Sequence, residues 1–386
     1  MVVERGVLTP IERAKRALTF QEVDRVALGG GFITHAPAIE AASGIRPMWN
    51  DPDQAMIEAY RRWKVDAILQ FVPPKRMEDQ TSYGDILHET NFRASSNPDL
   101  LRASFPGPEA VFEYVKRLPT PTEFERDFDF QAEYGAWLDL IRSRQDFMPD
   151  ILWIPGHKAG VVKFMWYSQF SFESYLMALA LDPEIMNRLF ELEGVKAHLR
   201  NQAIAKCIRD NDLFPLIYLG EDMCYNRGPL ANSKLLREIY FPHLEYGFRP
   251  LKEAGIKILW HTDGLAREVV PDLLAAGVDG FQGFQEELGM TLADYKALRT
   301  RDGDPLILWG SILVTRTLPF GTVDDVRAEV ERCIDTAQPG GGFVLMPSSS
   351  VGPEVPVENI QAMYEHAHTY GSAWVANGGR ASGRPA

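Results

Sequence analysis

Residues 256–281 read IKILWHTDGLAREVVPDLLAAGVDGF and contain one complete strand–helix–strand pattern. The apolar run 256–261 predicts a buried strand, Asp263 before LAREVVPDLL is a good helix start, and residues 278–284 predict the next strand. Short apolar strands that alternate with longer helical patterns are typical of βα units on a parallel sheet. The stretch therefore predicts a parallel α/β fold and places His261 at the end of a strand.

The same alternation continues along most of the chain. The predicted strands are residues 25–30, 65–72, 161–166, 216–221, 256–261, 278–284, 306–312 and 343–347. Eight strands with intervening helices predict a (β/α)8 TIM barrel of roughly 250 residues plus insertions. We expect residues 1–375 to form one barrel domain and residues 376–386 a flexible tail. Residues 82–149 are dense in aromatic, proline and acidic residues and are predicted to form an inserted lid.

Charge and cysteine content narrow the class of protein. The chain has 386 residues, with 53 acidic and 40 basic side chains and a formal net charge of -13. Such a chain repels a nucleic-acid backbone, and no basic run offsets this charge. The three cysteines lie far apart without CxxC spacing, which predicts a reducing compartment. No segment is apolar enough to span a bilayer. We therefore expect a cytoplasmic protein that acts on a small molecule and has neither a nucleic-acid nor a membrane partner. The sequence leaves open whether the protein forms a homodimer.

Polar residues follow several of the predicted strands, and in a barrel the chemistry gathers at these strand ends. His261 and Asp263 are two residues apart, so an extended chain projects both to the same side. Glu221, Asp222 or Cys224, after the preceding strand, could complete a metal site, because Zn²⁺ accepts imidazole, carboxylate and thiolate ligands. The alternative is structural: His261 caps its strand by hydrogen bonds and Asp263 is the N-cap of the next helix. Spacing alone leaves both interpretations open.

The segment PGHKAGVVKFMWYSQFSFESY is the second dense stretch. Met165, Trp166, Tyr167 and Phe170 supply a large apolar surface, and His157 precedes the predicted strand. One interpretation is an aromatic-lined substrate pocket. The other, equally consistent with these residue types, is core packing between the sheet and a helix.

Five segments carry a family resemblance. They are VDRVAL (23–28), DPEIMNRLFE (182–191), GEDMCYNRGPLANSKLLREIYFPHLEYGFRPLKEAGIKILWHTDG (220–264), AAGVDGF (275–281) and PGGGFVLMPSSSVGPEVPVENIQAMYE (339–365). In this order they resemble the uroporphyrinogen decarboxylase superfamily over nearly the whole chain. The resemblance implies a (β/α)8 fold, and the superfamily includes the decarboxylase of haem synthesis and methyltransferases that serve corrinoid proteins or thiols.

Two departures from that family's patterns bear on function. The Arg-rich segment with which the decarboxylase grips its substrate is replaced by GGGFITHAPAIEAASG (29–44), and the position of a family histidine is Ser349. Haem synthesis is disfavoured, because a substrate with many carboxylates needs fixed cationic partners. The thiol-alkylating members hold zinc with H-x-C and a later cysteine, where this chain has His261, Asp263 and Ser349. Oxygen and nitrogen ligands leave zinc a stronger Lewis acid, which favours an oxygen-containing substrate.

The members that use such oxygen and nitrogen sites demethylate methoxylated aromatic compounds with a corrinoid. The resemblance implies a methyltransferase that takes a methyl group from a small methoxylated, aromatic substrate and passes it to a corrinoid protein, with metal Lewis-acid activation. The chain has no corrinoid-binding DxHxxG segment, so a corrinoid would arrive only on a partner protein. The alternative is a decarboxylase of a small organic acid, in which His261 or Asp263 acts as a general acid.

In the methyltransferase interpretation, the resemblance implies three sets of site residues. The catalytic residues are His261, Asp263 and Glu221, and the zinc ligands are His261, Glu221, Asp263 and Cys224. The substrate-binding residues are Met165, Trp166, Tyr167, Phe170, His157 and Ser349.

Overall fold

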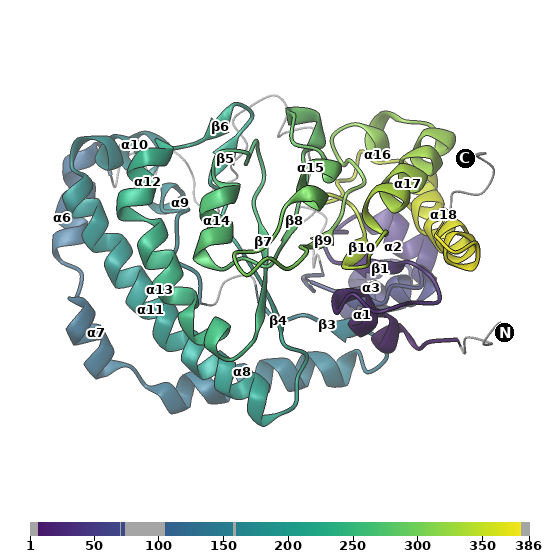
Figure 1. The fold of residues 1–386 in the computed structure, drawn as a ribbon, viewed down its shortest axis with the longest axis horizontal. Helices are drawn as coiled ribbons and strands as arrows, with labels where there is room; N and C mark the ends of the chain where they lie inside the picture. The colour runs from purple at the N-terminus through teal and green to yellow at the C-terminus, as the bar shows by residue number, and fades with distance from the viewer. Residues whose placement is uncertain (1–6, 70, 74–104, 157–159, 380–386) are drawn as a thin grey trace.

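Eight parallel strands form the central sheet of the computed structural model, which describes residues 7–69, 71–73, 105–156 and 160–379 (Figure 1). Their order in the sheet is β3-β2-β1-β10-β9-β8-β7-β4. Tyr218 of β4 also pairs in parallel with Gly156, just after β3, so the two ends of the sheet meet. The predicted α/β fold of the TIM-barrel type is confirmed. The strands are β1 (Ala27–Gly30), β2 (Ala67–Ile68), β3 (Leu152–Trp153), β4 (Leu216–Gly220), β7 (Lys257–His261), β8 (Gly280–Gln282), β9 (Ile307–Trp309) and β10 (Phe343–Leu345).

The third predicted strand, residues 161–166, is wrong. The third strand of the sheet is β3, Leu152–Trp153, and residues 161–166 pair with no strand among the described residues and end in a turn at Trp166. Its amides at Phe164 and Met165 instead donate to the carboxylate of Glu221. Because burial alternates along this segment as it does along a strand, the sequence pattern could not separate the two.

Helices surround the strands (Figure 1). Asp182 accepts a hydrogen bond from the amide of Ile185 and so caps α11, and Thr322 forms a capping box with Asp325 at the start of α17. No helix within the described ranges is long and apolar enough to cross a membrane. The helices are α1 (Pro10–Leu18), α2 (Ala36–Ser43), α3 (Pro52–Arg62), α6 (Pro108–Lys116), α7 (Pro121–Asp127), α8 (Phe130–Phe147), α9 (Tyr167–Phe170), α10 (Phe172–Leu181), α11 (Pro183–Asp210), α12 (Ser233–Ile239), α13 (Phe241–Glu253), α14 (Val270–Ala276), α15 (Leu292–Ala297), α16 (Thr317–Phe320), α17 (Val323–Ala337) and α18 (Val357–Ala376), with short 3₁₀ turns η1 (Met48–Asn50) and η3 (Glu286–Leu288) and an antiparallel pair, β5 (Cys224–Tyr225) and β6 (Gly228–Pro229).

The described part of the predicted insertion is helical. Helices α6, α7 and α8 all pack against the long helix α11, and Figure 1 shows α7 and α8 along its outer side. Residues 82–104 of the predicted lid lie outside the described residues. The lid, the domain limits and the tail therefore stay predictions.

Large side chains fill the inside of the barrel. Tyr218, Trp309 and Met346 are fully buried there, in a cluster with small residues such as Ala27. A Cβ atom at Gly29 would lie 2.2 Å from Trp309 Nε1, so only glycine leaves room for the indole. The barrel therefore has a packed interior, and polar residues after the strands lie above it.

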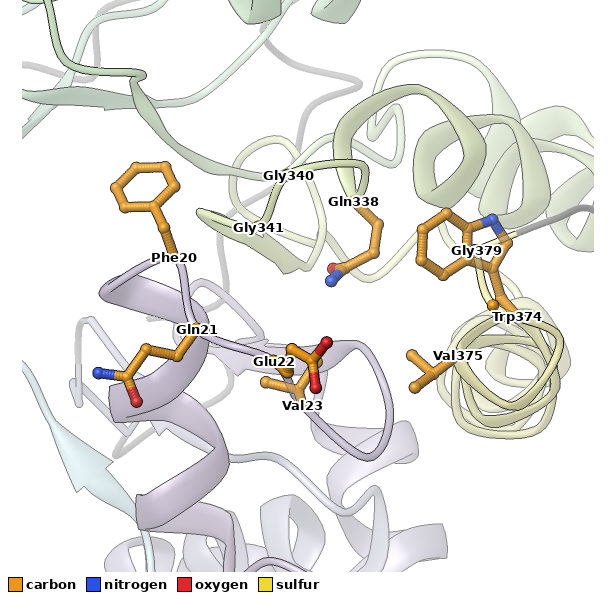
Figure 2. Close-up of a pocket in the computed structure, with 11 residues that line it drawn as sticks. Phe20, Gln21, Glu22, Val23, Gln338, Gly340, Gly341, Trp374, Val375 and Gly379 are labelled. Carbon is orange, nitrogen blue, oxygen red and sulfur yellow. The ribbon is translucent and has the colours of Figure 1, made fainter. Parts of the chain in front are cut away.

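A cavity of about 340 Å³ lies at the amino ends of β1 and β10, at the end of the barrel opposite the polar residues that follow the strands (Figure 2). Figure 2 shows Phe20 and Gln21 on one side of it and Trp374 and Val375 on the other. Residues that precede β1 and β10, together with the last residues of α18, line this cavity. The cavity is therefore separate from the predicted site, which lies at the carboxyl ends of the strands.

Candidate metal centre

Three side chains meet at the carboxyl ends of β4 and β7. Asp222, His261 and Asp263 each offer one ligand atom, and these atoms lie within 4.8 Å of one another. His261 Nε2 is 3.7 Å from Asp222 Oδ1 and 3.8 Å from Asp263 Oδ2. The parallel register that pairs Gly220 with His261 produces this approach, because it brings the residues after β4 beside the end of β7. The geometry is that of a small cation site.

His261 is buried and contacts two further side chains. Its Nδ1 atom is 2.7 Å from Oε1 of Gln282, at the end of β8. The ring of Phe32 lies 5.7 Å from the imidazole ring, tilted by 31°. Phe32 follows β1 and has a φ of 54°, a left-handed conformation that is uncommon for an aromatic residue. These contacts hold the imidazole between β8 and the loop after β1.

Asp263 has one partnered and one unpartnered oxygen. Ser349 Oγ donates to Asp263 Oδ2 at 3.4 Å, whereas Oδ1 is buried and has no hydrogen-bond partner among the described residues. Burial raises the pKa of Asp263 to about 6; the nearby charge of His261 lowers it, and that of Asp222 raises it further. A buried carboxylate oxygen without a donor is costly in a folded protein, and a bound cation would satisfy it.

Glu221 and Cys224, two predicted ligands, lie outside the cluster of three. Glu221 Oε2 accepts from the amides of Phe164 at 2.8 Å and Met165 at 2.6 Å, and burial raises its pKa to about 8. Burial, with the charge of Asp222, raises the pKa of the Cys224 thiol to about 12. The geometry thus groups Asp222 with His261 in the place where the sequence suggested Glu221, and the ligand roles of Glu221 and Cys224 stay predictions.

The predicted aromatic pocket residues differ in their surroundings. Trp166 stacks on Phe170, with ring centroids 5.2 Å apart at 10°, and both are buried in the main core. Tyr167 OH donates to the backbone carbonyl of Asp222 at 3.0 Å, and Met165 is half-buried. Trp166 and Phe170 pack in the core, Tyr167 and Met165 lie next to the residues after β4, and the substrate-binding role of all four stays a prediction.

Three predicted or overlooked residues complete the description. His157 lies outside the described residues. Gln282 and Phe32 touch His261, although neither was predicted as a site residue from the sequence. The signal for Gln282 was present, since it is a polar residue at the end of an apolar strand, like His261 itself. Phe32 had no comparable signal, because an aromatic residue after a strand is ordinarily part of the core.

Comparisons with a family model, a curated protein and a solved structure each find similarity to this chain. Residues 227–370 match the family model described as Uroporphyrinogen decarboxylase (URO-D). The chain is 25% identical over 150 residues to the methylcobamide:CoM methyltransferase MtaA of Methanosarcina barkeri (strain Fusaro / DSM 804); the match covers 38% of this chain and 42% of MtaA. A solved structure of a methyltransferase from Methanosarcina mazei matches with a TM-score of 0.54 and 14% identity, over 94% of this chain and 99% of that chain, which shows a shared fold. The family-model match and the similarity to MtaA support the resemblance to the uroporphyrinogen decarboxylase superfamily, and the solved structure supports the shared fold.

Proposed function

We propose that this protein is a metal-dependent methyltransferase that takes a methyl group from a small methoxylated aromatic compound and passes it to a corrinoid carried by a partner protein. The observation that carries the proposal is the meeting of Asp222, His261 and Asp263 at one point above the barrel. The two methyltransferases among its matches support methyl transfer as the reaction class.

The donor set fits a zinc ion. Zinc binds imidazole nitrogen and carboxylate oxygen at about 2.0–2.2 Å in a tetrahedron, so its ligand atoms are about 3.3–3.6 Å apart. The observed separations from His261 Nε2, 3.7 and 3.8 Å, are close to this range. Three protein ligands leave a fourth position open, as in catalytic zinc sites. A divalent ion bound by these residues would supply a Lewis acid to an ether oxygen.

The charges around His261 favour a neutral substrate. Asp222 and Asp263 place two carboxyl groups close to one imidazole. Since like charges repel strongly in a partly desolvated site, a small organic acid would be disfavoured there. A methoxylated ring carries no charge. Without a bound cation, these charges disfavour a metal-free decarboxylase of a small acid.

Apolar groups beside the cluster support an aromatic donor. The half-buried Phe32 presents its ring to His261, and Met165 lies next to the residues after β4. In the proposed transfer, the bond between the methyl carbon and the ether oxygen would break, and the Co(I) of the partner's corrinoid would supply the electron pair for a new bond to that carbon. The phenolate leaves with the electron pair of the broken bond. The relative MtaA is named for a methylcobamide, which supports a corrinoid as the acceptor.

The proposal predicts that purified protein contains about one zinc ion per chain and that His261→Ala loses it. A matched control is His366→Ala, because His366 also lies near a carboxylate, Glu331 at 2.9 Å, but on the outer helices α18 and α17. Elemental analysis measures zinc, and the absorbance of Co(I) cobalamin mixed with a methoxylated aromatic follows methyl transfer. Zinc-free wild-type protein after reconstitution, or unchanged transfer in His261→Ala, would contradict the proposal.

A further inference from the structure

We propose that Gln282 is a positioning residue that fixes the tautomer of His261, so that the lone pair of Nε2 faces the cation site. This inference rests on the proposed function, because it gives Nε2 the role of a metal ligand. Gln282 comes from β8, the strand beside β7, and is fully buried.

The orientation of the Gln282 carboxamide is fixed by its other partner. Gln282 Nε2 donates to the carbonyl of Ser348 at 2.9 Å. A backbone carbonyl can only accept a hydrogen bond, so the NH₂ group must face Ser348 and the oxygen must face the opposite way. Oε1 of Gln282 therefore points toward β4 and β7 as an acceptor.

That oxygen determines where the proton of His261 lies. Gln282 Oε1 is 3.2 Å from Tyr218 OH and 2.7 Å from His261 Nδ1. An amide oxygen carries no hydrogen, so Nδ1 has to be the donor at this short distance. In a neutral imidazole the second nitrogen is then an acceptor. Nε2 of His261 thus carries a lone pair.

The surroundings of His261 Nε2 are those of a metal ligand and not those of a hydrogen-bond donor. The carboxylate oxygens of Asp222 and Asp263 are 3.7 and 3.8 Å away, beyond the reach of an N–H donor. The gap between the three atoms is wide enough for a cation to contact each of them. A protonated Nε2 would instead draw one carboxylate to about 2.8 Å.

Packing on the ring prevents the imidazole from turning away. Gly283 follows Gln282 with φ +86°, and a Cβ atom there would lie 2.7 Å from His261 Nδ1. The ring of Phe32 also lies against the imidazole. The absence of a side chain at Gly283 lets β8 approach the imidazole edge, so packing sets the ring plane and Gln282 sets the tautomer.

The test compares Gln282→Leu and Gln282→Glu with the wild-type protein by zinc competition against a coloured chelator. Loss of an outer hydrogen-bond partner of a metal-binding histidine lowers metal affinity by about 10- to 100-fold, which is the loss expected for Gln282→Leu. Gln282→Glu keeps an acceptor oxygen for Nδ1 and is expected to restore most of the affinity. The control is Asn359→Leu, which removes another buried carboxamide, bonded to the carbonyls of Leu318 and Gly321.

A structural role and a positioning role give different results. The positioning role would be overturned if Asn359→Leu and Gln282→Leu lost the same zinc affinity at the same loss of unfolding free energy. It would also be overturned if Gln282→Leu bound zinc with the affinity of the wild type.

Nitrogen-15 NMR of the metal-free protein reads the tautomer independently, with the His261 signals assigned by their loss in His261→Ala. The expected result is a proton on Nδ1 in the wild type and a shift toward Nε2–H in Gln282→Leu. A wild-type proton on Nε2 would overturn the role of Gln282. The expected tautomer in a protein that binds no zinc would contradict the proposed function alone.

Discussion

At the scale of single residues, two adjacent carboxyl groups have opposite surroundings. Glu221 accepts hydrogen bonds from the backbone amides of residues 164 and 165. Asp222 Oδ1 instead faces His261 and accepts from the amide of Asp263 at 3.2 Å. Because successive side chains of an extended chain point to opposite sides, only one of the pair can reach the cluster. The structure assigns that position to Asp222.

We expect Asp222→Asn to lower zinc affinity at least about 10-fold, because a neutral amide is a weaker ligand than a carboxylate and outer-shell losses alone reach this size. Glu221→Gln is the matched variant, since it also replaces one carboxylate by an amide and keeps an acceptor for the two backbone amides. It is expected to bind zinc within a few-fold of the wild type. Chelator competition measures both. A larger loss of zinc affinity in Glu221→Gln than in Asp222→Asn would instead identify Glu221 as the ligand, as the sequence suggested.

The sequence could predict part of this site and not the rest. His261 and Asp263 follow from their spacing after an apolar strand, and the structure brings them together. The choice between Glu221 and Asp222 depends on the amides of residues 164–165, which are far away in the chain. Gln282 depends on the neighbouring strand β8. Contacts between loops and strands distant in sequence are not encoded in local spacing.

At the scale of elements, buried aspartates at the amino ends of two strands tie neighbouring strands together. Asp66, before β2, accepts from an amide of β1 at 2.8 Å and pairs with both Arg13 and Arg25 at 2.7 Å. Asp279, before β8, accepts from an amide of β7 at 2.8 Å and pairs with Lys252. In a barrel, this end of the strands serves stability. The repeated arrangement therefore fixes the barrel at the end opposite the candidate site.

We expect Asp66→Asn to lower the free energy of unfolding by about 3–5 kcal/mol, because it leaves Arg25 as a buried charge without its carboxylate partner, while Arg13 keeps Asp24. Asp150→Asn is the control, since Asp150 pairs with Arg61 at the surface and such pairs contribute about 0–1 kcal/mol. Urea denaturation measures both variants. Equal and small losses would show that the buried network does not hold β1 and β2 together.

The strand pattern explains why the fold could be predicted although one strand was misplaced. Runs such as 256–261 and 216–221 are apolar and flanked by helical patterns, so β7 and β4 lie where expected. β3 has only two residues, Leu152–Trp153, which is too short for a period to be visible. Its pairing is set by β2, whose partner residues the sequence does not reveal. The mostly apolar run VVKFMW at 161–166 predicted a strand that the sheet does not contain.

At the scale of the whole molecule, the candidate site places acidic groups out of water at one end of the barrel. The pKa of Glu221 is raised from 4.5 to about 8 by burial. Between these two values the folded protein binds a proton that the unfolded chain has released. The contribution of this group to stability is therefore present below pH 4.5 and is lost as the pH rises to about 8.

We expect the unfolding free energy of the metal-free wild type to fall, relative to that of Glu221→Gln, by up to about 1.4 kcal/mol per pH unit across this window. Glutamine does not titrate, so the difference between the two proteins isolates Glu221 from all other acids. Urea denaturation at pH 5, 6, 7 and 8 measures it. If the difference in unfolding free energy between the two proteins did not change with pH, the pKa of Glu221 would not be raised in the folded protein.

The packed interior of the barrel also governs the order of events at its mouth. Tyr218, Trp309 and Met346 plug the axis in the described part of the chain, so no passage leads through the barrel. A small molecule that reaches His261 from the carboxyl end of the barrel therefore has to leave from that end. For the proposed reaction, a corrinoid domain seated over that end would block both arrival and departure. The donor must therefore bind first, the corrinoid protein second, and the demethylated product can escape only after the corrinoid protein has moved away.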